Sequence, residues 1–228
     1  MSTMTLELKE GVHVLTLTNH EGENSLTIDV LKEYHAALDE VEAFEGNTAL
    51  MVTCEHEKTF STGINLGWLG QQSPEGIENF VSTLEKLYYR IALLEVPTVF
   101  AINGNCYAGG AIMASCADFR FMRADRGRFC YPEVNIHIPF THMMTDVIDL
   151  IPNKHALKYM ALLGTAYTGE ECKANNIVDD IFPMDQLQEQ SFAFAKQLAE
   201  KDRKTYGVIK RRLREKLAKR ELVPGYIA

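Results

Sequence analysis

Alternating apolar and polar residues predict that the chain begins with β-structure. Between Thr5 and Thr18 apolar side chains alternate with polar ones in two runs, the first of which contains Leu6 and Leu8, and Gly11 separates the runs. Such alternation is typical of strands with one buried face, and a glycine between two such runs is typical of a tight turn. The pattern therefore predicts a hairpin of two strands.

Helical spacing and short apolar runs then follow each other along the chain. The first helical stripe begins after Thr27, a suitable N-cap, and the second ends before Pro97, because proline disfavours helix at the preceding residue. Gly104 to Gly110 is predicted to be a turn of small residues. Helices are predicted over Ile28 to Phe44, Pro74 to Leu94 and Ala111 to Cys116, and strands over Thr48 to Cys54, Thr98 to Asn103 and Asp118 to Met122.

From about Thr141 the pattern is mainly helical. This order of elements favours an α/β fold of repeated β-β-α units with a helical C-terminal tail. We expect one domain over residues 1–228, with an α/β core over 1–140 and a helical region of the same domain over 141–228. The predicted helices of the tail cover His155 to Leu163, Gly169 to Asn175, Asp185 to Lys201 and Tyr206 to Arg220.

Composition and charge narrow the class of protein. The 228 residues are 46% hydrophobic and carry a net charge of −8, which argues against nonspecific binding to nucleic acid or to an anionic membrane. Five cysteines without metal-ligand spacing predict reduced thiols in the core. We find no apolar stretch of membrane-spanning length, no secretory leader and no C-terminal peroxisomal tripeptide, so a cytoplasmic protein is expected, with a mitochondrial or peroxisomal one still open for a eukaryotic source.

Two glycine-containing loops and one carboxylate are the candidates for chemistry. Gly63, in the loop from Phe60 to Leu66, permits a turn that leaves the N–H of Ile64 pointing into a cleft. The N–H of Gly109 opens the predicted helix that follows, where unsatisfied donors and the helix dipole stabilise an oxyanion. Taken alone, each feature also fits an ordinary loop.

Glu133 is the carboxylate, and apolar residues surround it in the sequence. Poor solvation of such a group raises its pKa and suits it to carry a proton. A single glutamate after a proline is also common as a surface or capping residue.

In this order and spacing the three segments resemble the crotonase superfamily, also called the enoyl-CoA hydratase/isomerase family, over nearly the whole chain. The loop F-S-T-G-I-N-L resembles the first oxyanion loop of that family, and A-G-G-A-I-M-A-S-C-A-D-F-R-F-M resembles its second oxyanion turn with the helix and strand that follow. The segment from Thr168 to Asp179 resembles part of its helical tail.

The resemblance implies a spiral of β-β-α units, a coenzyme A thioester as substrate with no separate cofactor or metal, and assembly into homotrimers or hexamers. It also implies roles for individual residues. The N–H groups of Ile64 and Gly109 would bind the thioester oxygen and Glu133 would be the base. The residues expected to contact the substrate are Ser61 and the loop Asn24-Ser25-Leu26 along the pantetheine, together with Gly63 and Phe140.

Departures from the family pattern favour one reaction. Hydratases of the family use two glutamates, and Ile112 stands at the position of the first. Glu133 matches the lone base of the Δ3,Δ2-enoyl-CoA isomerases, and one carboxylate is enough to move a proton from C2 to C4. We therefore expect an enoyl-CoA isomerase of fatty-acid metabolism. The alternatives are an enoyl-CoA hydratase or other crotonase-type lyase, and a non-catalytic crotonase-like protein that binds CoA or RNA.

Several other side chains have two interpretations. His137 and His142 follow Glu133 and are read as loop residues, although a proton-transfer role stays open. Met143 and Met144 line the acyl pocket or fill the core. Asp118 is expected to be structural.

The basic segment from Lys210 to Arg220 also has two interpretations. It is either a solvated helix face or a contributor to binding of the CoA phosphates. For the second role the arginines of interest are Arg211, Arg212 and Arg214.

Overall fold

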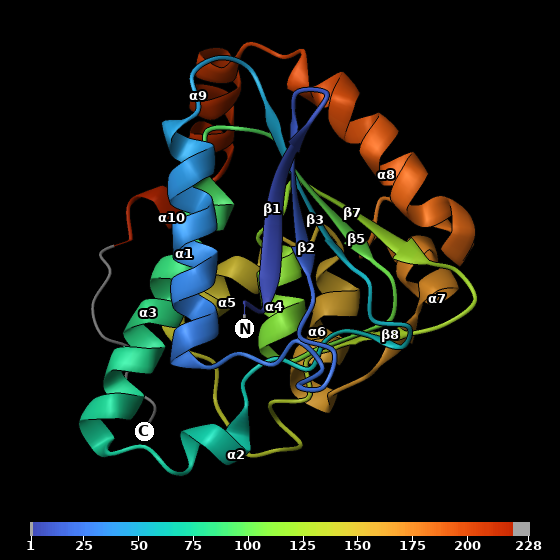
Figure 1. Cartoon of the computed structure of the whole chain (residues 1–228). Helices are drawn as coiled ribbons and strands as arrows, with labels where there is room; N and C mark the ends of the chain where they lie inside the picture. The colour runs from blue at the N-terminus through green and yellow to red at the C-terminus, as the bar shows by residue number, and fades with distance from the viewer. Residues whose placement is uncertain (1, 221–228) are drawn as a thin grey trace.

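The computed structural model describes residues 2–220, and a six-stranded sheet is the centre of the fold (Figure 1). The strand order is β1-β2-β3-β5-β7-β10, in which only the β1–β2 pair is antiparallel. Glu10 and Gly11 join β1 to β2 with φ values of 46° and 82°, as a two-residue hairpin requires. The strands of this sheet are β1 (Met4–Lys9), β2 (Val12–Leu17), β3 (Ala49–Cys54), β5 (Thr98–Ile102), β7 (Phe119–Arg123) and β10 (Asp180–Phe182).

A second, smaller sheet lies beyond the ends of these strands and makes the chain a spiral. Its order is β4-β6-β8-β9, with β4 (Thr59–Ser61), β6 (Asn105–Tyr107), β8 (Arg128–Cys130) and β9 (Tyr167–Thr168). Each of β3, β5 and β7 is followed by one strand of the small sheet and then by a helix. Successive turns of the spiral therefore stack in chain order. The loop after each short strand lies on the same side of the molecule.

The helices cover both faces of the large sheet. On one face, α8 packs on β3, β5 and β7 over a separate apolar cluster that includes Val99, Phe121 and Leu187. The other face, with Leu50 and Phe100, meets the main core. The helices are α1 (Ile28–Ala43), α2 (Leu66–Leu69), α3 (Pro74–Leu93), α4 (Gly109–Ser115), α5 (His142–Ile148), α6 (Lys154–Leu163), α7 (Gly169–Ala174), α8 (Met184–Ala199), α9 (Arg203–Leu213) and α10 (Glu215–Ala218).

Most of the predicted elements are confirmed, and their boundaries follow local chemistry. Thr27 caps α1 by accepting from the N–H of Val30, and Ser73 caps α3 with Pro74 in the first turn. The predicted single helix from Tyr206 to Arg220 is wrong in one respect, because Arg214 at φ −109°, ψ 33° separates α9 from α10. The four short strands of the small sheet were not predicted, since two or three residues carry no readable period.

A buried ionic cluster attaches the C-terminal helices to the core. Asp118 pairs with Lys210 at 2.7 Å and with Arg214 at 3.0 Å, and the Lys210 side chain is 3% exposed. The same carboxylate accepts hydrogen bonds from the backbone N–H of Thr98 and the hydroxyl of Tyr206. The structural role expected for Asp118 is confirmed, and the expectation of a free basic face is wrong for Lys210 and Arg214.

Candidate active site

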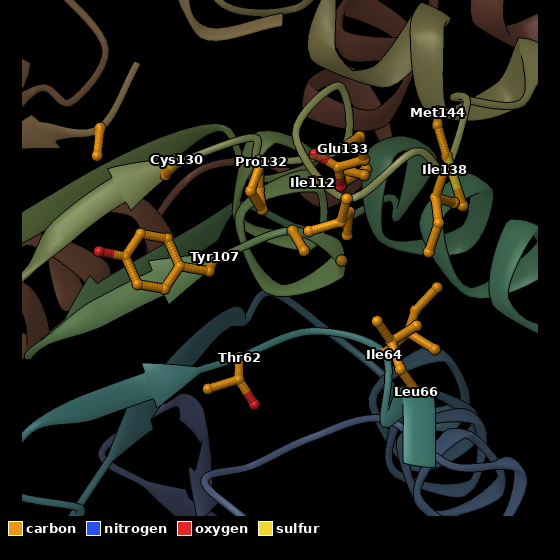
Figure 2. A pocket seen from close by; sticks show the side chains of 14 residues that line it. Thr62, Ile64, Leu66, Tyr107, Ile112, Cys130, Pro132, Glu133, Ile138 and Met144 are labelled. Carbon is orange, nitrogen blue, oxygen red and sulfur yellow. The ribbon is translucent and has the colours of Figure 1, made fainter. Parts of the chain in front are cut away.

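One cavity of about 400 Å³ brings the candidate residues together (Figure 2). It lies between the loops that follow the short strands β4, β6 and β8 and the first turns of α4 and α5. Its wall is mostly apolar. The lining residues are Thr62, Ile64, Leu66, Tyr107, Ala108, Gly109, Ile112, Cys130, Pro132, Glu133, Ile136, Ile138, Met144 and Ala166.

Ile64 and Gly109 both line this cavity, as the oxyanion hypothesis requires. Leu26 forms a parallel β-bridge with Ile64. The N–H of Leu26 donates to the carbonyl of Gly63, and the carbonyl of Leu26 accepts from the N–H of Asn65. The N–H of Ile64 is therefore directed away from this bridge. Gly109 is the first residue of α4, so its N–H has no partner within the helix. Among residues 2–220 neither N–H has an acceptor.

The two loops approach each other so closely that glycine is required. Gly63 has a φ of 81°, and a Cβ there would lie 2.5 Å from the nitrogen of Gly109. A Cβ on Gly110 would lie 2.7 Å from the Cβ of Ser61. The relative position of the two candidate donors is therefore set by direct backbone contact, not by flexible side chains.

Ser61, Asn24 and Leu26 are buried behind this contact and do not line the cavity. The Ser61 hydroxyl donates to the carbonyl of Asn24 and accepts from the N–H of Gly63, which holds the first loop in its turn. The Asn24 amide donates to the carbonyl of Phe60. These hydrogen bonds shape the loop, and contact of the three residues with pantetheine stays a prediction.

Glu133 is a buried carboxylate without a charged partner. It is 5% exposed, and its Oε2 has no hydrogen-bond partner among the described residues. Burial raises its pKa to about 7, against a smaller opposing effect of its own backbone N–H. Hydrogen bonds from Asn135 and Ile136 to the carbonyl of Pro132 form the turn that presents it. A carboxyl group with this pKa exchanges protons readily at neutral pH.

Ile112 lines the same cavity, and Figure 2 shows its side chain beside Glu133. Apart from Glu133, the lining residues with oxygen or sulfur in their side chains are Thr62, Tyr107, Cys130 and Met144. Glu133 is therefore the only carboxylate among the described lining residues. Burial raises the pKa of the Cys130 thiol to about 11, which keeps it protonated at neutral pH.

Other expected residues fall in and around the cavity. Met144 lines it, whereas Met143 is buried elsewhere and Phe140 stacks edge-on against Tyr131 outside the wall. His137 and His142 are exposed and do not line the cavity. His137 lies in a loop, as predicted, whereas His142 is the first residue of α5. The sequence did not predict that Tyr107, Cys130 and Ala166 line the cavity, because the short strands that position them have no periodic pattern of apolar residues.

The two ends of the basic segment lie differently with respect to this cavity. Figure 1 shows α9, which carries Arg211 and Arg212, at the end of the molecule opposite α2, whose Leu66 lines the cavity. The α10 end packs on α5, the helix that carries the lining residue Met144. Arg214 donates to the carbonyls of Ala92 and Cys116, so it stabilises the attachment of the C-terminal helices to the core. Arg211 and Arg212 do not line the cavity, and their role in binding the CoA phosphates stays a prediction.

Further properties concern the cysteines, the potential metal ligands and the apolar helices. All five cysteines are free and buried, as predicted. Within residues 2–220 no cluster of three or more potential metal ligands occurs, and no helix there is long and apolar enough to cross a membrane.

The fold is that of a known structural class. A crystal structure of a probable enoyl-CoA hydratase from Mycobacterium tuberculosis H37Rv superposes with a TM-score of 0.87, covering 94% of this chain and 89% of that chain at 20% identity. This likeness confirms the crotonase-type spiral of β-β-α units with its helical C-terminal region.

The sequence defines the family more closely. Residues 7–225 match the enoyl-CoA hydratase/isomerase family, and the chain belongs to that family. It is 29% identical over 179 residues to enoyl-CoA delta isomerase 3 of Arabidopsis thaliana, which covers 77% of this chain and 75% of that protein. It is also 31% identical over 194 residues to a putative enoyl-CoA hydratase of Thermus thermophilus, which covers 84% of this chain and 76% of that protein.

Proposed function

We propose that this chain is an enoyl-CoA isomerase that shifts a double bond between C3 and C2 of an acyl-CoA. The observation that carries the proposal is the pairing of Glu133 with Ile112 in one cavity. A relative named as a delta isomerase supports the same reaction, although relatives named as hydratases are similarly close. The names of the relatives do not separate the two reactions, and the chemistry of the cavity wall supports the isomerase.

The isomerisation needs one group that both removes and returns a proton. The ionised Glu133 carboxylate takes a proton from C2 of a 3-enoyl thioester, and the electron pair of that C–H bond moves onto the thioester oxygen. The resulting dienolate is stabilised by the N–H groups of Ile64 and Gly109. Protonated Glu133 then gives the proton to C4, which leaves the double bond between C2 and C3 and regenerates the carboxylate.

Water addition makes a different demand on the site. A hydratase must hold and activate a water molecule as well as deliver a proton, and for this its family members use a second carboxylate. Ile112 has no atom that binds or deprotonates water, and the wall around it is apolar. The balance of groups in the cavity therefore favours proton transfer over hydration.

The proposal is tested by assaying the purified protein with 3-enoyl-CoA and 2-enoyl-CoA of several chain lengths and following both reactions spectrophotometrically. We expect isomerisation of the 3-enoyl substrates with hydration slower by at least two orders of magnitude. Hydration at a rate comparable to isomerisation would replace the isomerase proposal with that of a hydratase. The absence of both activities, with binding of the thioesters retained, would indicate a non-catalytic binding protein.

A further inference from the structure

The helix that carries Gly109 begins without the usual cap. Ala108, its N-cap residue, makes no side-chain hydrogen bond to the first turn and has a φ of 48° and a ψ of −128°. A non-glycine residue in this region of backbone space is strained and persists only when its surroundings hold it. Gly109 itself has no Cβ to restrict its rotation. The direction of the Gly109 N–H therefore depends on contacts from outside the helix.

Two hydrogen bonds from distant segments supply these contacts. The N–H of Ala108 donates to the carbonyl of Cys130 at 3.0 Å, which fixes the backbone before Gly109. The hydroxyl of Tyr88, from the C-terminal half of α3, donates to the carbonyl of Gly109 at 3.0 Å, which fixes the backbone after it. The same hydroxyl lies 3.1 Å from the position that a Cβ on Gly109 would occupy, so it packs directly against the glycine.

Tyr88 is well suited to be a permanent donor. Its side chain is completely buried, and burial raises its pKa well above the ordinary value, so the hydroxyl keeps its proton. It lies on a twenty-residue helix that packs on α1, α4 and α5, which makes its position rigid.

We propose that Tyr88 is a positioning residue of the oxyanion site: by binding the carbonyl of Gly109, it aims the N–H of Gly109 at the thioester oxygen. This inference rests on the proposed function, because it needs Gly109 to be an oxyanion donor. Tyr88 does not line the cavity, so we expect no direct contact between its side chain and the substrate. Its contribution is therefore to the strength of the hydrogen bond that the substrate oxygen receives.

The competing interpretation is that Tyr88 only satisfies its own buried hydroxyl. Buried tyrosines usually find a hydrogen-bond partner, and loss of the bond would then lower stability alone. The two interpretations differ in the polarisation of the bound substrate. A hydrogen bond to a thioester carbonyl lowers its stretching frequency, whereas a change in global stability does not.

The experiment compares the unmodified protein with Tyr88→Phe and with Tyr34→Phe. Tyr34 is a second fully buried tyrosine, on α1, and its hydroxyl has no hydrogen bond to α4 within residues 2–220. Three quantities are measured for each protein: kcat and KM with a 3-enoyl-CoA, the melting temperature, and the infrared carbonyl frequency of a bound 2-enoyl-CoA labelled with 13C at the thioester carbon.

In the unmodified protein we expect the labelled carbonyl to absorb at lower frequency when bound than when free. For Tyr88→Phe we expect part of that shift to be lost and kcat to fall about tenfold, with KM changed less than about twofold. Tyr34→Phe should keep the full shift and kcat. A Tyr88→Phe protein with an unchanged carbonyl frequency and kcat would overturn the inference. If the unmodified protein itself shows no shift, the oxyanion site of the proposed function fails, and the role of Tyr88 fails with it.

Discussion

At the scale of single residues, the environment of Glu133 determines what the site can do. A carboxylate among apolar side chains without a cation nearby keeps a proton to higher pH than an exposed one. The sequence indicated this environment because Phe129, Tyr131 and Val134 surround the residue in the chain. It placed Ile112 beside Glu133 only through the family resemblance, because contacts between segments about twenty residues apart depend on the fold.

The raised pKa predicts the pH dependence of the reaction. Removal of the C2 proton needs the ionised carboxylate, so kcat/KM for a 3-enoyl-CoA should rise with pH and level off above about pH 7, where Glu133 is ionised. The measurement is kcat/KM between pH 5.5 and 8.5 at constant ionic strength. A profile that stays flat across pH 7, or one that falls, would be incompatible with Glu133 as the base.

The same pKa predicts an effect on stability. Folded Glu133 binds its proton up to about pH 7, whereas the unfolded chain releases it near the ordinary value of 4.5. The folded state therefore loses stability as the pH rises between these values. Glu133→Gln has no carboxyl group at this position, so it does not lose this stability. The free energy of unfolding of Glu133→Gln minus that of the unmodified protein should therefore be larger at pH 8 than at pH 4.5, by on the order of 3 kcal/mol. Urea unfolding at both pH values measures it, and an equal difference at the two values would disprove the burial effect.

At the scale of elements, close contacts at Gly63 and Gly110 hold the two candidate oxyanion loops together. The sequence alone indicated these contacts only in part. The glycines were visible as turn signals and the helix after Gly110 was predicted, but the segment from Gly104 to Gly110, predicted to be a turn, contains β6 and the first residues of α4. The partners of the glycines were not visible, because Ser61 and Gly110 are forty-nine positions apart in the numbering and meet only when β4 pairs with β6. The same reason explains why the sequence did not reveal that Ser61 holds the turn at Gly63.

Gly110→Ala tests this packing. Alanine favours a helix over glycine by about 1 kcal/mol, but its Cβ would lie 2.7 Å from the Cβ of Ser61 and 2.9 Å from its carbonyl oxygen. Rotation of a side chain cannot relieve that contact, so the clash wins, and we expect a net loss of about 1–3 kcal/mol in unfolding free energy and at least a tenfold fall in kcat.

Gly67→Ala is the matched control for this substitution. The nearest atom to a Cβ at Gly67, in α2, is the Asn65 Oδ1 at an ordinary 3.6 Å. Gly67→Ala should therefore keep its activity and its stability. A fully stable and active Gly110→Ala protein would show that the two loops are not locked together.

At the scale of the whole molecule, the ionic cluster around Asp118 decides whether the C-terminal helices stay attached. The sequence showed the basic residues of this region but not that two of them turn inward, because helical periodicity does not reveal a buried carboxylate on another segment. Assembly into trimers or hexamers stays a prediction from the family resemblance, as does the arrangement of the CoA phosphates.

Asp118→Ala should be strongly destabilising. It leaves Lys210 and Arg214 with buried charges and no carboxylate, and breaking a buried ion pair in this way typically costs about 3–5 kcal/mol. Glu215→Ala is the control, because its pair with Lys219 is exposed and should contribute little to stability. Denaturant unfolding of both variants gives the comparison, and equal effects would mean that the cluster does not hold the helices in place.

The central claim of this account is that one carboxylate moves the proton, and the isomerisation rate of Glu133→Gln tests it most directly. Glutamine keeps the size of the side chain and removes its basicity, so thioester binding should survive. The rate measured with 3-enoyl-CoA at pH 8 and saturating substrate should fall by about two to four orders of magnitude, the usual contribution of general acid–base catalysis. A Glu133→Gln protein that isomerises 3-enoyl-CoA at the rate of the unmodified protein would contradict the account.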